Sequence, residues 1–539
     1  MNPSISKDKD ERGAVSRPAQ KKQRVEEAVH DLSRLPDELK KTDFSRPIRW
    51  GKYAPYPHED DSTIPASSIP TVSLETPPVF TELSPALCHH VHALSGRARA
   101  CTIHLKPHKG QTARSVPTPI FMPVGTKGCL KSLTFEELTT DPALSCPIIL
   151  ANTYHMALQP GTELLDEWEG LHPFMGNITS KDLNFNLLTD SGGFQMVSLV
   201  KLSQVTEEGV TFENPFLQPH KGNHGKRQLT SIKTTETPES HCNNEADNEK
   251  QDNNMMMLLR PEDSIKFQND IGANIIMALD DVVSSVVVDP DRFETATYRT
   301  LRWYDRCVQA HKKTADQNLF PIVQGGLDTS PGGLRERCLA GFRRRELELN
   351  YIIPGYAIGG LAGGESKDDF WRVVDQCCKA LPDNKPRYLM GVGYPLDLVI
   401  CSALGCDMYD CVYPTRTARF GVALVPGRTP GTLRLKSNEC ATDANVIQKG
   451  CPCQACSANI PRARLHRLIK TDHPLAIQLL TQHNIAYMMS LVRGMREAIL
   501  QDKFADFARD FVRDQFPGDG GEDIPTWVRE ALAAAGIEV

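Results

Sequence analysis

Residues 356–393 read YAIGGLAGGESKDDFWRVVDQCCKALPDNKPRYLMGVG and contain one complete repeating unit of the chain. An apolar run at 356–360 ends in two glycines, an amphipathic stretch follows at 365–380, and a second apolar run occupies 388–393. Apolar runs of this length are typical of strands buried on both faces, and the amphipathic stretch is typical of a helix that crosses between them. The pattern therefore predicts a strand-helix-strand unit with parallel strands.

Runs of this kind occur eight times, and each ends in polar residues or glycines. They lie at 120–125, 148–153, 187–193, 275–281, 322–326, 356–360, 388–393 and 408–412. A second amphipathic stretch, at 296–312, predicts another crossover helix. Eight such units predict an α/β fold, a (β/α)8 TIM barrel, in which the carboxyl ends of the strands carry the active site. A doubly wound open sheet, whose strands merely end in turn residues, is the alternative interpretation.

The composition is that of a soluble globular protein, with 539 residues of which 40% are hydrophobic and 24% charged. No stretch approaches about 20 consecutive apolar residues, so we expect no transmembrane segment. The N-terminus lacks an apolar core and is rich in acids, which argues against secretory and mitochondrial signals. Sixteen cysteines in such a chain are more typical of reduced thiols and metal ligands than of disulfides. We therefore expect a cytoplasmic protein, and an association with the mitochondrial outer surface is compatible with this expectation.

Two regions depart from the pattern of a packed domain. Residues 1–85 hold eleven prolines and little periodicity, and they predict a disordered N-terminal extension. The KKQR run at 21–24 matches a nuclear-import patch, but such a short run is more typical of a solubilising segment. Residues 215–254 are polar and Asn-rich, and they predict a low-complexity surface insertion. We expect residues 86–539 to form the globular domain that carries this insertion.

Charge is distributed unevenly along the chain. The net charge of −6 by itself predicts no polyanionic partner. Residues 412–470 differ, because ten Lys or Arg residues against two acids give this segment a local charge of +8. A basic segment of this kind is typical of a surface that contacts the phosphate backbone of a nucleic acid. A solvated basic face without a partner is the alternative.

A cysteine cluster of the form C-x-C-x-x-C lies at 451–456 and indicates a metal site. Three thiolates and one imidazole make a closed tetrahedral shell that suits one structural Zn²⁺ per chain. We expect this zinc-binding segment to span 440–490. Spacing alone leaves three candidates for the fourth ligand, namely His466, His473 and His483. Buried free thiols beside Cys440 are the alternative to a metal site.

Two aspartates stand at the ends of predicted strands. Asp410 closes the eighth run before the cationic turn 414–419, and Asp190 precedes Ser191-Gly192-Gly193. A carboxylate at this position can attack an anomeric carbon and form a covalent glycosyl-enzyme intermediate. Asp190 is its natural partner, since paired carboxylates can divide nucleophilic and proton-transfer roles. The alternative is that one or both carboxylates only accept backbone N–H groups in tight turns.

Other strand ends carry groups that suit recognition of a purine. Asp280 can accept from two adjacent N–H groups, Gln324 offers donors and an acceptor, and the glycines at 359–360 allow close approach of the backbone. Enzymes that act on extruded bases read them with such groups. Phe194 and Met390 can supply apolar faces on either side of the base. Each residue alone is more often part of a core or a turn.

Six blocks of sequence resemble the tRNA-guanine transglycosylase family, and within it most closely the eukaryotic queuine-inserting catalytic subunits. The blocks are TDSGGFQMVSL (189–199), IIMALDDVVSS (275–285), IVQGGLD (322–328), AIGGLAGGES (357–366), RYLMGVGYPLDL (387–398) and DMYDCVYPTRTARFG (407–421). The resemblance implies exchange of the wobble guanine of GUN anticodons for queuine, by double displacement through a covalent aspartyl-ribose intermediate. Val282 stands where bacterial members have a cysteine, which favours queuine over its bacterial precursor.

The resemblance also implies a role for each site residue. Asp410 is implied as the nucleophile and Asp190 as the proton acceptor and donor. The implied base-binding residues are Asp280, Gln324, Gly360, Leu361, Phe194, Met390, Ser191, Gly192 and Gly193. The implied RNA contacts are Arg416 and Arg419, and the implied zinc ligands are Cys451, Cys453, Cys456 and His483.

The resemblance further implies a heterodimer with a homologous non-catalytic subunit, in which this chain is the active member because Asp190 and Asp410 are both present. Two rival functions remain. A barrel glycosidase would also use paired carboxylates but would have no use for a basic zinc segment. A non-catalytic RNA-binding subunit of the same complex would keep the cysteine cluster and tolerate loss of the carboxylates.

Overall fold

The computed structural model describes residues 80–81, 84–111, 113–179, 184–193, 204–213, 256–349, 351–518 and 523–539. The disordered extension predicted for 1–85 lies outside these residues except for its last few positions, and the insertion predicted for 215–254 lies outside them entirely.

Each of the eight apolar runs contains a strand. In chain order the strands are β4 (Ile120–Pro123), β5 (Ile148–Ala151), β6 (Asn186–Thr189), β10 (Ile275–Met277), β12 (Ile322–Val323), β13 (Tyr356–Ile358), β14 (Arg387–Leu389) and β15 (Met408–Cys411). A further short strand, β11 (Asn318–Phe320), precedes β12. Nearly every residue in these strands is buried, as expected for strands covered on both faces.

The strands form two parallel sheets with the orders β11-β10-β6-β5 and β12-β13-β14-β15-β4. The edges of the two sheets meet, because Val124, directly after β4, forms a parallel bridge with Leu150 of β5. At the other edge, Pro321 alone separates β11 from β12. The carbonyl of Phe320 accepts a hydrogen bond from Ala278, and that of Pro321 accepts one from Ala357 of β13. Strand pairing therefore continues from one sheet to the next on both sides.

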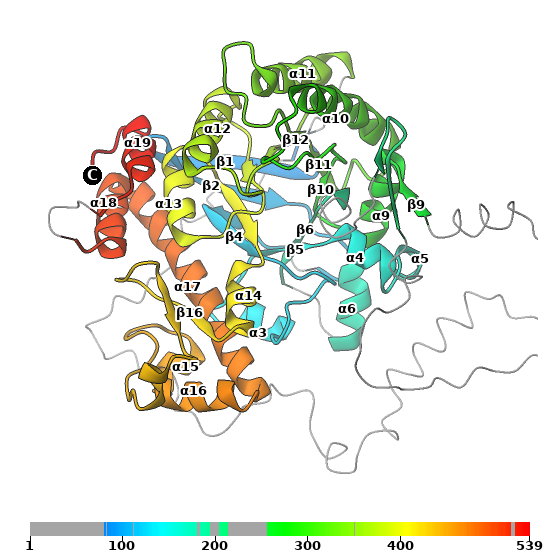
Figure 1. Cartoon of the computed structure of the whole chain (residues 1–539). Coiled ribbons are helices and arrows are strands. Elements are labelled where there is room, and N and C mark those ends of the chain that lie inside the picture. The colour runs from blue at the N-terminus through cyan, green and yellow to red at the C-terminus, as the bar shows by residue number, and fades with distance from the viewer. Residues whose placement is uncertain are drawn as a thin grey trace, which may run out of the picture.

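Helices surround these strands (Figure 1). They include α9 (Pro261–Ile271), α10 (Pro290–Ala310), α11 (Leu334–Glu348), α12 (Lys367–Ala380) and α13 (Pro395–Ala403). The predicted crossover helices at 296–312 and 365–380 are confirmed by α10 and α12. The side chain of Ser366 caps α12 by accepting from the Asp369 N–H at 3.1 Å, and an apolar face that includes Phe370 and Val374 is buried.

An antiparallel sheet of β1 (Leu87–Ser95), β2 (Ala98–Leu105) and β3 (Val116–Thr118) lies against the amino ends of the parallel strands. Arg99 in β2 forms a buried ion pair with Asp407, directly before β15, at 3.2 Å. Asn318, the first residue of β11, donates to the Ala86 carbonyl before β1 at 3.1 Å. The amino ends of the strands are thus covered, which leaves their carboxyl ends for a site.

The C-terminal part follows β15 and extends from one side of the strands (Figure 1). Its elements are α14 (Tyr413–Arg419), β16 (Val422–Leu424), β17 (Thr432–Arg434), the 3-10 turn η2 (Asn438–Ala441), α15 (Gln454–Ser457), α16 (Arg462–Lys470), α17 (Pro474–Leu500), α18 (Phe504–Gln515) and α19 (Thr526–Ala534). The long helix α17 runs from this part to β1 and β2. Within the described ranges, no helix combines the length and apolar character that a membrane span requires.

Candidate active site and metal centre

Asp190 lies directly after β6, and neighbouring residues hold its carboxylate in place. The backbone N–H of Thr153 donates to Oδ1 at 2.9 Å, and the Asn152 amide donates to Oδ2. Both donors follow β5, which pairs with β6, so the parallel register brings them to this carboxylate. Asp190 is buried. The bonds to Oδ1 and Oδ2 fix the orientation of the Asp190 carboxylate.

Asp410 lies inside β15 and is held by the neighbouring strand β14. The Tyr388 hydroxyl donates to its Oδ1 at 2.6 Å, and the backbone N–H of Gly391 donates to the same oxygen at 2.7 Å. Burial raises the pKa of the Asp410 carboxyl, and the bonds from Gly391 and Tyr388 oppose this rise. The other oxygen, Oδ2, receives neither of these bonds. The carboxylate is therefore oriented by one oxygen while the second can face a reactant.

Asp410 and Asp190 lie near the same ends of the parallel strands β15 and β6, which β4 and β5 separate, and both carboxylates act on Tyr388. Burial raises the pKa of the Tyr388 hydroxyl well above its usual value, and the charges of Asp410 and Asp190 raise it further. The Tyr388 phenol thus lies within the electrostatic field of both carboxylates. The residues predicted from the sequence as nucleophile and proton-transfer group thus lie at the same end of the parallel strands, although 220 positions separate them in the chain.

A second buried cluster joins the ends of β10 and β12. The Gln324 amide donates from Nε2 to Asp280 Oδ2 at 2.6 Å, and Ser191 donates from Oγ to Asp280 Oδ1 at 3.2 Å. Burial raises the pKa of the Asp280 carboxyl to about 6, against the opposing effect of these two hydrogen bonds. Because Ser191 follows Asp190 directly, the two clusters adjoin one another.

The predicted glycines lie where backbone approaches these side chains. A Cβ added to Gly359 would lie 3.1 Å from Gln324 Nε2 and 3.8 Å from Met390 Sδ. A Cβ added to Gly193 would lie 3.4 Å from the Asp280 carbonyl oxygen. Gly360 adopts a positive φ of 69°, which favours glycine. Close packing at these turns therefore explains the absence of a side chain.

The remaining predicted base-binding residues divide into two groups. Ser191, Gly192 and Gly193 are buried beside Asp280, whereas Leu361 and Met390 are half-buried at the ends of β13 and β14. Phe194 lies outside the described residues.

Three residues of the site were missed by sequence reasoning, namely Tyr388, Asn152 and Thr153. Their signal is weak but present, because Asn152-Thr153 and Tyr388 belong to apolar runs that were recognised as strands. Tyr388 sits within a run, where an aromatic residue is ordinarily part of the core.

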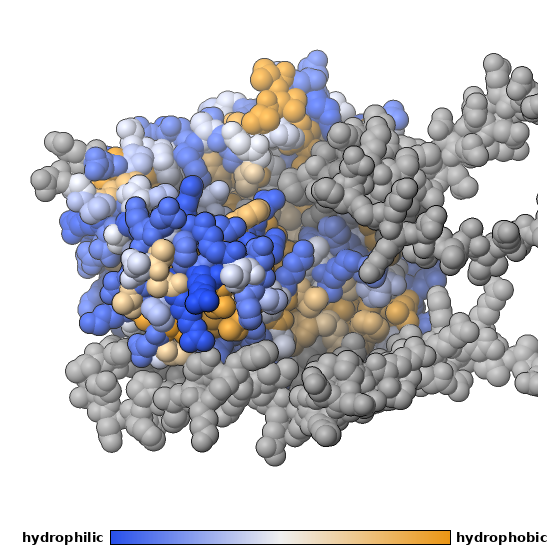
Figure 2. Space-filling model, turned by 60° about the horizontal axis from the view of Figure 1, so that its bottom comes forward, coloured by the Kyte–Doolittle hydropathy of each residue, from blue (hydrophilic) through white to orange (hydrophobic). Residues whose placement is uncertain are grey.

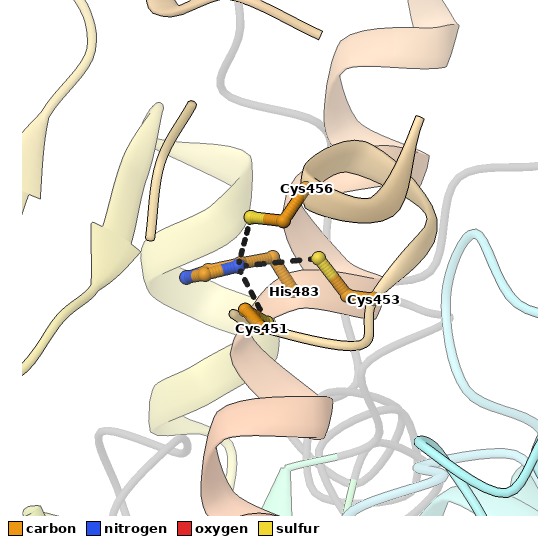
Figure 3. A group of neighbouring side chains, drawn as sticks. All are labelled: Cys451, Cys453, Cys456 and His483. Carbon is orange, nitrogen blue, oxygen red and sulfur yellow. Dashed lines mark hydrogen bonds between the residues drawn. The ribbon is translucent and has the colours of Figure 1, made fainter. Parts of the chain in front are cut away.

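The cysteine cluster and His483 form a compact group that can hold a metal ion (Figure 3). The distances from His483 Nδ1 to the Sγ atoms of Cys451, Cys453 and Cys456 are 3.6, 3.3 and 3.6 Å. All four side chains are buried. The Nε2 of His483 lies 2.8 Å from the Leu424 carbonyl, which places its proton there and leaves the Nδ1 lone pair for a metal. His466 instead points to the Leu435 carbonyl, and His473 caps α17.

Asn484, next to His483, connects the metal centre to α14. Its Oδ1 accepts from the Leu424 N–H at 2.9 Å, and its Nδ2 donates to the Pro414 carbonyl at 3.0 Å. Helix α14 begins three positions after Asp410 and carries Arg416 and Arg419, which are both exposed. The metal centre is therefore linked through one side chain to the helix that follows the predicted nucleophile.

The basic segment is largely free to meet a partner. Of its ten cations, the exposed ones are Arg416, Arg419, Arg428, Arg434, Lys436, Lys449, Arg464, Arg467 and Lys470. Arg462 is half-buried and pairs with Asp443 at 2.9 Å. Hydrophilic side chains gather on the face of the molecule that α15 and α16 occupy (Figure 2).

Comparison with known proteins gives a consistent result. The model of the family described as "Queuine tRNA-ribosyltransferase" matches residues 94–237 and 223–517. The chain is 43% identical over 449 residues to the queuine tRNA-ribosyltransferase catalytic subunit of Schizosaccharomyces pombe, covering 82% of this chain and 95% of the relative. It is 40% identical to the catalytic subunit of Caenorhabditis elegans, covering 84% and 99%, and 39% identical to the enzyme of Thermus thermophilus, covering 83% and 98%. With most of its length matched in this way, the chain belongs to the queuine tRNA-ribosyltransferase family.

Proposed function

We propose that this chain is a tRNA-guanine transglycosylase that exchanges the wobble guanine of GUN anticodons for queuine. The observation that carries the proposal is the Tyr388-centred pair of Asp410 and Asp190, adjoining the buried Asp280-Gln324 cluster. One cluster supplies a nucleophile and a proton carrier, and the other supplies groups that read a purine. The family names of the relatives support the same reaction.

In the proposed reaction, Asp410 attacks C1′ of the nucleoside from the face opposite the base. The glycosidic bond breaks, and the departing guanine takes up a proton that Asp190 delivers. The result is an ester between Asp410 and C1′ of the ribose. Incoming queuine then gives a proton to Asp190 and displaces the Asp410 carboxylate, so configuration is retained overall.

Base recognition is proposed for the second cluster. The Asp280 carboxylate accepts from adjacent N–H groups of the purine, while Gln324 and the Gly360 backbone donate to its carbonyl oxygen. Ser191, Gly192, Gly193 and Leu361 line the pocket, and Met390 and Phe194 stack on the base. Val282 in place of cysteine supports queuine as the incoming base.

We propose that the two parallel sheets form one closed (β/α)8 barrel, with residues 440–490 as its zinc-binding segment. The Val124-Leu150 bridge and the direct succession of β11 and β12, with only Pro321 between them, support closure. Zn–S bonds of about 2.3 Å and a Zn–N bond of about 2.0–2.1 Å at a tetrahedral angle separate S from N by about 3.6 Å. The separations of 3.3–3.6 Å between the thiols and His483 fit one structural zinc ion.

The proposed partners are tRNA and a second subunit. Arg416 and Arg419 would contact the anticodon, since α14 starts beside Asp410, and the rest of the basic segment would meet the phosphate backbone. The eukaryotic relatives are named catalytic subunits, which supports a further subunit. The proposed partner is a homologous non-catalytic chain, and the proposed location is the cytoplasm.

The experiment is incubation of purified protein, with and without its partner subunit, with tRNA and labelled guanine or queuine. We expect label to enter the RNA, and Asp410→Ala to abolish both exchange and covalent trapping of RNA while metal content stays unchanged. Asp316→Ala, an exposed aspartate before β11, is the matched control and should exchange normally. Exchange that persists in Asp410→Ala would reject the assigned nucleophile.

The two rival functions predict different results in the same assay. A glycosidase would neither bind tRNA nor be inhibited by it. A non-catalytic subunit would bind tRNA but show no exchange even when its partner is present.

A further inference from the structure

Arg335 is fully buried beneath the proposed base-binding cluster, at the start of α11. Its Nε donates to the Gly326 carbonyl and its Nη1 to the Val323 carbonyl, each at 2.8 Å. These two carbonyls flank Gln324 in the chain, so the guanidinium fixes the turn that carries this amide. A buried cation is costly, and its presence under a proposed binding pocket calls for a physical reason.

The turn is also pressed closely against α11. A Cβ added to Gly325 would lie 2.6 Å from the Arg335 backbone nitrogen, and Gly325 has a φ of +132°. The Gln324 N–H points to the Cys338 thiol of the same helix at 3.4 Å. Contacts with α11 therefore fix the backbone of Gln324, and the Gln324 side chain extends toward Asp280.

The third guanidinium nitrogen, Nη2, has no nitrogen or oxygen acceptor among the described residues, and the side-chain neighbour of the guanidinium is the Cys377 thiol of α12. A Cβ added to Gly360 would lie 3.4 Å from this nitrogen and in direct contact with Gln324 Oε1. The cation and the amide oxygen thus border the same point beside Gly360. The amide nitrogen faces the other way and donates to Asp280 at 2.6 Å.

This arrangement favours one orientation of the Gln324 amide. Nε2 is bonded to the Asp280 carboxylate, and Oε1 lies on the side of Gly360 that Arg335 Nη2 also borders, so the amide dipole runs in the favourable direction between the two charges. A rotation of 180° would bring the amide oxygen to the Asp280 carboxylate and the amide donors to the guanidinium, both of which are unfavourable. A base bound to Asp280 competes with the Gln324 amide for this carboxylate. Arg335 then still favours the same orientation of the Gln324 amide.

We propose that Arg335 is a positioning residue that sets base selectivity, by keeping the donor end of the Gln324 amide turned toward the bound purine. A fixed donor selects a base with a carbonyl at position 6 and rejects one with an amino group there, because the amino group would leave two donors face to face. This inference rests on the proposed function and names a determinant of its specificity.

The test compares guanine with 2,6-diaminopurine as competitors for exchange into tRNA. The second base has an amino group at position 6 and no proton on N1, and the effect of N1 at Asp280 is common to all variants and cancels when they are compared. In Arg335→Met the amide is free to rotate, so we expect the preference for guanine to fall about tenfold. The KM for guanine should rise more than kcat falls, since the carboxylate pair is untouched. Arg335→Lys keeps a cation at this place and should retain most of the preference for guanine. It also provides a second variant to measure if Arg335→Met folds poorly.

A double-mutant cycle separates positioning from a purely structural role. In a Gln324→Ala background, Arg335→Met should leave the ratio of the two bases unchanged, because no amide remains to orient. An unchanged ratio in Arg335→Met, with only lower thermal stability, would overturn the role of Arg335. Absence of exchange by the unsubstituted chain with its partner would instead reject the proposed function.

Discussion

The Tyr388 hydroxyl donates a 2.6 Å hydrogen bond to Oδ1 of Asp410, and the two residues belong to neighbouring parallel strands. The Gly391 N–H donates to the same oxygen from the end of the same strand as Tyr388. The nucleophilic role proposed for Asp410 requires an ionised and oriented carboxylate, and these two donors favour the ionised form and fix the orientation. Donors in β14 and directly after it therefore orient the carboxylate of Asp410 in β15.

Replacement of Tyr388 by Phe should shift the acid limb of the pH-rate profile upward. Loss of a hydrogen bond to a charged group, about 1.5–3 kcal/mol, raises the pKa of Asp410 by about one to two units. We therefore expect activity at neutral pH to fall while activity at alkaline pH is largely kept. The measurement is kcat for guanine exchange between about pH 5 and 9. Tyr409→Phe is the matched control, since its hydroxyl lies 2.8 Å from Ser402 Oγ instead, and an identical shift in both variants would contradict the prediction.

Replacement of Asp280 by Asn should abolish base binding yet stabilise the fold at high pH. Burial raises the pKa of Asp280 to about 6, above its unfolded value of 3.8, so the folded protein binds this proton more tightly. Stability is therefore lost as pH rises from about 4 through 6, by up to about 3 kcal/mol. We expect the variant to exceed the unsubstituted chain in free energy of unfolding at pH 8 and to match it near pH 4. Denaturant titrations at the two pH values decide this, and an equal difference at both would contradict it.

Replacement of Cys453 by Ala should remove the metal. Three ligands remain and leave an open shell, so we expect zinc content to fall from about one per chain to near zero. The thermal midpoint should drop by more than about 5 °C. Elemental analysis and a thermal scan measure both effects. Cys440→Ala is the matched control, because this buried thiol points to the Arg434 carbonyl at 3.7 Å and stands outside the ligand group. Full zinc content in Cys453→Ala would disprove the assigned site.

Replacement of both Arg464 and Arg467 by Gln should reduce the salt dependence of tRNA binding. Each phosphate contact contributes about 0.7–0.9 to the slope of log affinity against log salt, so the slope should become shallower by about 1.4–1.8. Affinities measured from about 50 to 300 mM salt give this slope. The control is Arg302→Gln on α10, which pairs with Glu207 at 2.7 Å and should leave the slope unchanged. An affinity of the unsubstituted chain that is flat across salt would remove the basic segment from the interface.

The strands could be predicted because a parallel strand covered on both faces leaves a local signature. Ile275–Met277 and Tyr356–Ile358 are apolar at every position, and the apolar runs that contain them end at Asp280 and Gly359. Strand β11 was not predicted from the sequence, because the polar residue Asn318 interrupts the apolar pattern. The Asn318 side chain bonds the Ala86 carbonyl. A contact between residues far apart in the chain leaves no pattern in the local sequence around Asn318.

The site residues that could be predicted from the sequence are those at the carboxyl ends of strands. Asp190, Asp280 and Gln324 each follow an apolar run, and the structure brings them together. Tyr388 was not assigned a role, because only the register between β14 and β15 places its hydroxyl against Asp410. Arg335 was not recognised either, since an arginine at the start of an amphipathic helix ordinarily faces solvent and here is fully buried.

Asn484 lies between two parts of the molecule, the metal-ligand group and helix α14. Its amide bonds Pro414 in the helix that follows Asp410, while the preceding residue, His483, belongs to the metal-ligand group. A small shift of α17 on metal loss would therefore be transmitted to α14, the helix with the proposed RNA contacts, without any change at the carboxylates. We expect organisms grown under zinc scarcity to show undermodified tRNA before they show a shortage of the enzyme itself.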